Sequence, residues 1–200
     1  MELEDSHSRW NLIVAAALFV VILSCYLVIL SPTVSFWDSG EFIATATILG
    51  IPHPPGTPFY VLVAHLFSML PFHEKALGVN LFSALSGTFS AVFLYLITVK
   101  LLVMWRGVPR SKREKAIIYV SGACAAIAGA FSSSHWEDCI EAEVYAASSL
   151  LMSVTIWLML RWLEHRHEEG SRNGLVLICY LLALSIGLHL GTGLVLPAFI

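Results

Sequence analysis

Two carboxylates and a histidine lie within one polar stretch of this sequence, and they are residue types that perform acid–base chemistry. Asp38 and Glu41 are three residues apart in the stretch 36–42, FWDSGEF, a spacing that places both on one face of a helix. Partly desolvated beside the ring of Trp37, Asp38 could act as a general base. His53 opens the stretch HPPGTP, whose prolines and glycine could hold the imidazole near the aspartate to bind a phosphate or orient a substrate.

The same residues also have a purely structural explanation. Asp38 is a favourable N-cap, and Glu41 three residues later completes an acidic variant of the capping box. The stretch that begins at His53 could be only a turn. Both explanations stay open at this point, and a capping residue can also be catalytic.

A second group of acids precedes a later apolar run. Its members are Glu137, Asp138, Glu141 and Glu143. Acids at a helix start favour the helix dipole, but a carboxylate at a membrane edge is costly unless it is solvated or used. Glu143 is the deeper of the last two and therefore the stronger candidate. His189, in the stretch GLHLGT, is expected to make a packed polar contact or to contribute to a donor site.

The composition sets the class of protein. Hydrophobic residues make up 58% of the 200-residue chain and charged residues only 12%, whereas soluble domains carry about 25% charged residues. We therefore expect an all-α, polytopic integral membrane protein. No basic stripe or motif indicates nucleic-acid binding. The cysteines form no CxxC motif and are expected to be small buried hydrophobic residues: Cys25, Cys124, Cys139 and Cys179.

The apolar runs predict about five transmembrane helices. Their ranges are 12–30, 76–99, 116–134, 144–160 and 174–196. The loop 31–75 is expected to hold two short helices, at 39–49 and 59–72, the second too short to span the membrane. Gly122, Ala126 and Ala130 are four apart and predict close helix packing. The apolar end of the sequence indicates that residues 1–200 are the N-terminal part of a single, longer transmembrane domain.

Basic residues decide the expected orientation. If residues 59–72 do not span the membrane, the following residues share the side of the N-terminus: Arg106, Arg110, Lys112, Arg113, Lys115, Arg161, Arg166 and Arg172. The opposite side then has only Lys75. We expect the N-terminus to be cytoplasmic and the Asp38 loop to be periplasmic or lumenal, on the same face as the second acidic group. The compact loops favour a bacterial cytoplasmic membrane.

The stretches WDSGEF and GIPHPPGTP, at residues 37–42 and 50–58, resemble the membrane family catalogued as domain of unknown function 2723. Its animal relative is a protein O-mannosyltransferase acting in the secretory pathway. IEAEVY at 140–145 and, more weakly, LSIGLH at 184–189 extend the resemblance over residues 12–192. The resemblance implies a glycosyltransferase of the GT-C class, in which the first external loop carries an essential acid and two short juxtamembrane helices.

The resemblance also implies roles for individual residues. A sugar would pass, with inversion, from a polyprenyl-phosphate donor to a hydroxyl of a protein or glycan acceptor. Asp38 would be the base that deprotonates the acceptor, Glu41 would support it, and Glu143 would be the acid of the second loop. The expected substrate-binding residues are Trp37, His53 near the donor phosphate, Glu141 and His189. No metal is required, although Asp38, Glu41 and Glu143 could share a divalent ion.

Two other classes of function stay open. In a transporter or lipid-handling protein the acids would form a cation or proton path. In a non-catalytic membrane scaffold they would serve only as helix caps. For an enzyme, the donor phosphate would have to be held by Lys75, His53, His135, helix N-termini or an expected part of the protein after residue 200, because the external loops carry almost no arginine or lysine.

Overall fold

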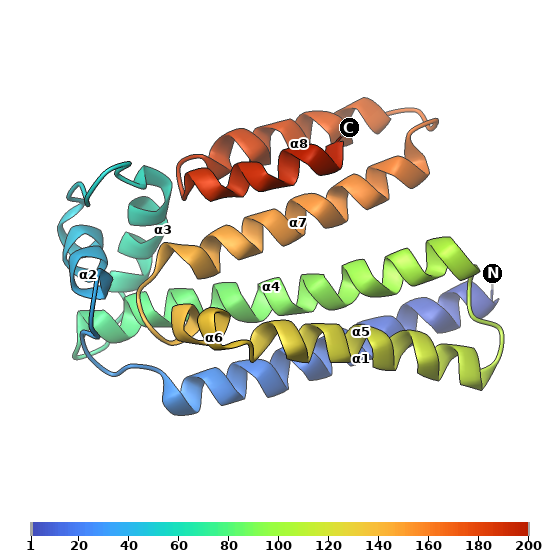
Figure 1. Ribbon diagram of the computed structural model, residues 1–200, viewed down its shortest axis with the longest axis horizontal. Helices are drawn as coiled ribbons and strands as arrows, with labels where there is room; N and C mark the ends of the chain where they lie inside the picture. The colour runs from blue at the N-terminus through green and yellow to red at the C-terminus, as the bar shows by residue number, and fades with distance from the viewer. Residues whose placement is uncertain (1, 200) are drawn as a thin grey trace.

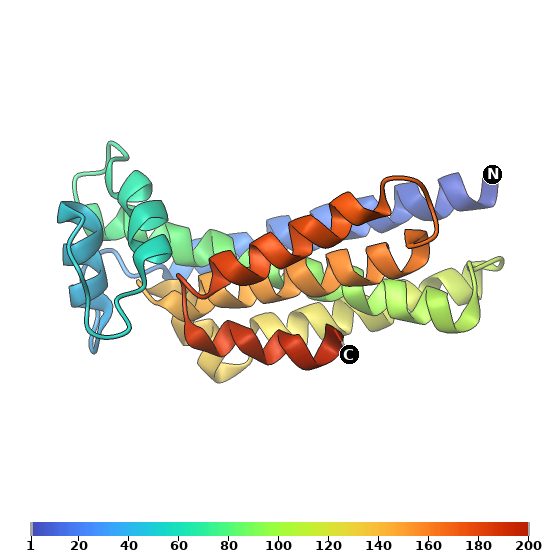
Figure 2. The same cartoon turned by 90° about the horizontal axis from the view of Figure 1, so that it is seen from above.

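The computed structural model describes residues 2–199, and side chains for residues 7–195, as helices joined by short loops without any strand in that range. The helices are α1 (Glu2–Ile29), α2 (Ser39–Ile48), α3 (Pro58–Ser68), α4 (Lys75–Arg106), α5 (Lys112–Ala130), α6 (Ser133–Ile140), α7 (Val144–His165), α8 (Ser171–Ser185) and the 3-10 segment η1 (Leu190–Phe199). Helix α4 runs through the middle of the bundle, and α2 and α3 lie together at the end opposite the start of α1 (Figures 1 and 2). The expected all-α class is confirmed.

Among the described residues, three helices are long and apolar enough to cross a membrane. They are α1 over His7–Ile29, α4 and α7, and a fourth span results if α5 and α6, bent by 67°, count as one broken span. The chain is therefore a membrane protein, but the expected number of about five spans is not confirmed. The first, second and fourth predicted ranges overlap α1, α4 and α7, although α1 begins earlier and α4 and α7 end later than predicted.

The predicted range 116–134 contains a break rather than a continuous helix. Helix α5 ends at Ala130 and α6 starts at Ser133. At the break, the Ser132 hydroxyl donates to the Gly129 carbonyl at 2.9 Å. Serine side chains compete in this way with the helical backbone bonds, so a run of serines favours a change of direction.

The predicted range 174–196 is also divided. Helix α8 ends at Ser185, and η1 folds back beside it (Figure 1). Between them the Gly187 carbonyl accepts a hydrogen bond from the Phe59 backbone N–H at 2.9 Å. A Cβ atom on Gly187 would lie 3.0 Å from the Phe59 Cβ, so this close approach of the break to α3 favours a glycine.

The predicted small-residue packing between helices is confirmed. A Cβ atom on Gly122 would lie 2.8 Å from a ring carbon of Tyr95 on α4, and Ala126 and Ala130 are fully buried. Close approach of this kind maximises van der Waals contact, which membrane helices depend on where no water is available to be expelled.

Aromatic rings fix α2 and α3 on the end of α4. The ring of Phe42 on α2 lies 5.2 Å from that of Tyr60 on α3, and Tyr60 lies 5.6 Å from Phe82 on α4. Ring pairs at such separations add to the apolar burial of each side chain. On the other side, the fully buried Asn80 amide donates to the carbonyls of Ser31 and Thr33, 2.7 and 3.2 Å away. The segment that leads to Asp38 is thus tied to α4.

Candidate functional site

Asp38 lies directly before α2 and its carboxylate is exposed. It occupies the N-cap position, yet its side chain makes no capping hydrogen bond, and its backbone is helical with φ −77° and ψ −10°. The acidic capping box expected from Glu41 is absent. The expected partial desolvation is absent too, because Asp38 itself is exposed and the neighbouring Trp37 side chain is 92% exposed. The Asp38 carboxylate is therefore free to meet a substrate.

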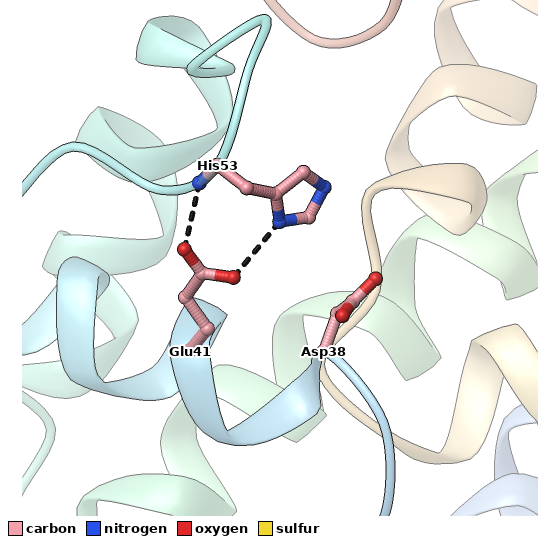
Figure 3. Close-up of side chains that lie close together, drawn as sticks. All are labelled: Asp38, Glu41 and His53. Carbon is pink, nitrogen blue, oxygen red and sulfur yellow. Dashed lines mark hydrogen bonds and ion pairs between the residues drawn. The ribbon is translucent and has the colours of Figure 1, made fainter.

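Glu41 holds His53 through two hydrogen bonds. Its Oε1 accepts from the His53 backbone N–H at 2.6 Å, and its Oε2 lies 2.8 Å from the His53 Nδ1 (Figure 3). The hydrogen bond that the Glu41 carboxylate accepts raises the pKa of His53, and the charges of Asp38 and Glu143 make smaller contributions in the same direction. The same bonds lower the pKa of Glu41. Glu41 therefore favours the charged form of the imidazole relative to a free histidine, and the Nε2 is turned away from Glu41 (Figure 3).

The turn that presents His53 is fixed by its own backbone. The Gly56 N–H donates to the His53 carbonyl at 2.9 Å, and Gly56 has a φ of 90°, which suits a residue without a Cβ. Trp37 and Thr57 also have positive φ angles, 59° and 32°, which are uncommon for residues with large or branched side chains. Such conformations gather at functional sites, where the surrounding structure enforces them. Here they flank the two segments that carry Asp38 and His53.

The second acidic group meets the first at the same end of the bundle. The Ser31 N–H donates to the Ile140 carbonyl at 3.0 Å and joins the loop before α2 to the end of α6. Glu143 directly precedes α7, is 8% exposed, and its backbone N–H lies 3.4 Å from the Ser83 hydroxyl on α4. Glu141 is partly exposed two residues earlier. The two groups thus lie at the same end of the bundle, as their predicted position on one face of the membrane requires.

Burial gives Glu143 unusual acid–base properties. Desolvation is the main cause that raises the pKa of its carboxyl to about 7. The charges of Asp138, Asp38 and Glu141 act in the same direction. Near neutral pH, Glu143 is therefore only partly ionised.

Replacing Glu143 with glutamine should stabilise the protein at alkaline pH. Because the folded-state pKa lies above the ordinary value of 4.5, the folded protein keeps a proton that the unfolded chain has lost, and its stability falls as the pH rises from about 4.5 to about 7. At pH 8 the raised pKa lowers the free energy of unfolding by roughly 3 kcal/mol, and the glutamine variant should recover this amount. Denaturation of the two proteins in detergent at acidic and alkaline pH measures it.

The matched control is the exposed Glu137, whose replacement with glutamine removes a solvated charge. This variant should show no comparable gain at alkaline pH. An equal gain in both variants, or none for Glu143→Gln, would contradict a buried carboxyl at position 143.

The remaining predicted site residues lie beside this group rather than within it. His189 packs its ring against Tyr145 at the start of α7, 5.1 Å between ring centres, and its Nδ1 accepts from the Gly191 N–H at 3.0 Å. It thus makes the packed polar contact expected of it. The exposed Trp37 side chain borders Asp38 but has no ring partner among the described residues.

A metal could in principle meet three of these side chains. Ligand atoms of Asp38, Glu41 and His53 lie within 4.8 Å of one another. The third possible ligand in this group is therefore His53, whereas the sequence analysis named Glu143. Both oxygens of Glu41 are already engaged with His53, so a divalent ion would compete with those bonds.

Sequence reasoning missed the residues that hold this group in place. Asn80 donates a hydrogen bond to the segment before Asp38, and the ring of Phe42 lies 5.7 Å from that of His53. An asparagine within the first turns of an apolar helix is a signal that could have identified Asn80, because a polar side chain there needs a partner.

The comparisons with known proteins agree on one family. The family described as "Protein O-mannosyl-transferase TMEM260 N-terminal domain" matches residues 38–200. "Protein O-mannosyl-transferase TMEM260" of Mus musculus is 30% identical over 151 residues, which are 75% of this chain and 20% of the relative. "Protein O-mannosyl-transferase tmem260" of Dictyostelium discoideum is 26% identical over 165 residues, 78% of this chain and 18% of the relative. The chain thus spans about a fifth of the length of these curated relatives. No solved structure matches it significantly.

Proposed function

We propose that this chain, which belongs to the family described as the Protein O-mannosyl-transferase TMEM260 N-terminal domain, is part of a membrane glycosyltransferase. It would move a sugar from a polyprenyl-phosphate donor to a hydroxyl of a protein or glycan acceptor. The names of the two relatives support a mannosyl donor.

One observation carries the proposal: an exposed, uncapped Asp38 carboxylate shares one end of the bundle with an imidazole that Glu41 holds (Figure 3). Asp38 supplies a base for an incoming hydroxyl, and His53 supplies a cation beside it. Inverting transfer from a sugar phosphate needs both, because the nucleophile must lose a proton and the departing phosphate gains negative charge.

The reaction follows from these two roles. Asp38 takes the proton of the acceptor hydroxyl as its oxygen attacks the anomeric carbon on the face opposite the phosphate. A new C–O bond forms, the bond from the anomeric carbon to the phosphate oxygen breaks, and that oxygen keeps the electron pair. The imidazolium of His53 stabilises the charge that collects on the phosphate. Glu41 acts as a positioning residue for His53 rather than as a direct support for Asp38.

Glu143 fits this scheme as a carboxyl that is only partly ionised. A second full negative charge beside Asp38 would repel the donor phosphate, whereas a protonated carboxyl can donate a hydrogen bond to it. The position of Glu143 between α6 and α7 makes it the acid of the second loop in this proposal.

The arrangement of short helices supports a GT-C-like architecture. Helices α2 and α3 follow α1 and precede α4, as the two juxtamembrane helices of that class do. In this proposal their end of the bundle faces the periplasm or the lumen, and the start of α1 faces the cytoplasm. The structure favours this enzyme over a scaffold whose acids only cap helices, because Asp38 makes no capping bond.

A donor comparison tests the proposal. Purified protein is incubated with a hydroxyl-bearing peptide and labelled mannose, carried either on polyprenyl phosphate or on a nucleoside diphosphate. We expect label on the peptide only from the lipid-phosphate donor, with inverted configuration at the anomeric carbon. Transfer from the nucleotide sugar alone, or retained configuration, would contradict the proposed mechanism.

A further inference from the structure

A polar cavity lies at the opposite end of the bundle from Asp38 and has no part in the proposed transfer. It has a volume of about 340 Å³ and opens between α1, α4 and α7. Its polar lining consists of His7, Asn11, Lys100, Arg161, Glu164 and His165. His7 marks the edge of the first membrane span, so the cavity lies where the headgroups of one leaflet would be.

Among the described side chains of this cavity, Arg161 is the cation that forms no ion pair. Lys100 is paired with Glu164, Nζ to Oε2 at 2.5 Å. Arg161 packs its guanidinium over the ring of Trp157, 5.1 Å from the ring centre, and no carboxylate of the described side chains is within ion-pair distance. The flat guanidinium is thus held by an aromatic face while its N–H donors stay available. Bidentate donation to a phosphate is the interaction that suits this group best.

A buried amide provides a second, independent indication. The Oδ1 of Asn11 lines the same cavity, is buried, and has no hydrogen-bond partner among the described residues. A buried polar atom without a partner is costly, and the two ends of an amide are interchangeable by rotation. With its NH₂ group turned into the cavity, Asn11 would donate to an oxygen of a bound anion. The free-energy cost of an unpaired buried polar atom would then be removed.

We infer that this cavity binds the phosphate of an anionic phospholipid headgroup, with Arg161 as its main ligand and Asn11 and Lys100 beside it. The cavity is large enough for a phosphate group, carries an excess of positive charge, and is framed by three membrane spans, so a lipid can enter it from the bilayer. Basic cavities between transmembrane helices are suited to such headgroups. This binding does not depend on sugar transfer at the other end.

The test compares two arginines whose guanidinium groups each lie over a tryptophan ring. Arg161 lies on a tryptophan inside the cavity, whereas Arg106 lies on Trp105, 4.9 Å from the ring centre, at the same end of the bundle but outside the cavity. The protein and its variants are reconstituted in nanodiscs of phosphatidylcholine with a minor fraction of phosphatidylglycerol. Native mass spectrometry then measures the lipid that each protein retains.

We expect the unmodified protein to retain phosphatidylglycerol in preference to phosphatidylcholine. Arg161→Gln should weaken this preference about tenfold, the loss expected for one charge-assisted hydrogen-bonding group. Arg161→Lys should recover part of it, and Arg106→Gln should leave it unchanged. The Arg161→Lys variant keeps the test valid if the glutamine variant folds poorly.

Two results would overturn the inference. An equal loss in Arg161→Gln and Arg106→Gln would mean that diffuse surface charge attracts the lipid. Release of the lipid by inorganic phosphate at equal concentration would mean that the cavity recognises free phosphate rather than a headgroup.

Discussion

Replacing Asp38 with asparagine should lower sugar transfer by roughly 100- to 10,000-fold, the contribution typical of a general base. Asparagine keeps the size of the side chain and its compatibility with the N-cap position, so only the ability to accept a proton is lost. Because Asp38 makes no capping bond, thermal stability and expression should not change. Initial rates with a lipid-phosphate donor, together with a thermal melt of the same preparation, measure both effects.

Glu74 offers a matched control for this variant. It is the N-cap residue of α4, and its side chain also makes no capping hydrogen bond. Glu74→Gln therefore removes a comparable carboxylate close to α3 and should leave transfer unchanged. Full activity in Asp38→Asn would eliminate Asp38 as the base, and an equal loss in Glu74→Gln would point to a general effect of loop charge.

Replacing His53 with glutamine should lower transfer by roughly 100- to 1,000-fold, as expected when one group that stabilises transition-state charge is removed. The pair with Glu41 also predicts a pH effect. Because the pKa of His53 is raised above its ordinary value of 6.5, more of it is cationic at a given pH than of a free histidine, and activity should fall as the pH rises through that raised value. Glu41→Gln removes the main cause of the shift, so the decline should begin at lower pH. Rate profiles of the three proteins from acid to alkaline pH measure this.

The exposed His73 is the control for His53, because it lies in the loop between α3 and α4 and only approaches Glu74 at 4.0 Å. His73→Gln should keep both the rate and the alkaline decline of the unmodified protein. If Glu41→Gln leaves the alkaline decline where it was, Glu41 does not set the charge of His53.

The sequence predicts the parts of this structure that local pattern controls. The two short helices after α1 appear close to their predicted ranges, and α2 ends at Ile48 with Leu49 in a left-handed conformation, next to the predicted end at residue 49. The spacing of Gly122 and Ala126 correctly predicts tight packing. The sequence pattern behind each prediction lies within one or two helical turns, although the partner of Gly122, Tyr95, is on another helix.

Features that depend on partners distant in sequence could not be predicted in the same way. Glu41 is placed to cap its own helix, yet it bonds His53, because the turn brings a backbone N–H and a ring nitrogen to it together. The burial of Glu143 depends on α4, through Ser83. The division of the last apolar run depends on Gly187 meeting Phe59. Hydropathy alone gives the length of such a run but not its contacts.

The proposal gives Asp38 the role of base and His53 the role of phosphate ligand. The affinity of two variants for the donor tests these separate roles most directly. Binding of a polyprenyl-phosphate mannose to Asp38→Asn and His53→Gln is measured by titration in the same detergent as the unmodified protein. We expect Asp38→Asn to bind the donor as tightly as the unmodified protein although it transfers almost no sugar, and His53→Gln to bind it more weakly. If Asp38→Asn loses donor binding in proportion to its loss of transfer, the carboxylate holds the donor and is not the base.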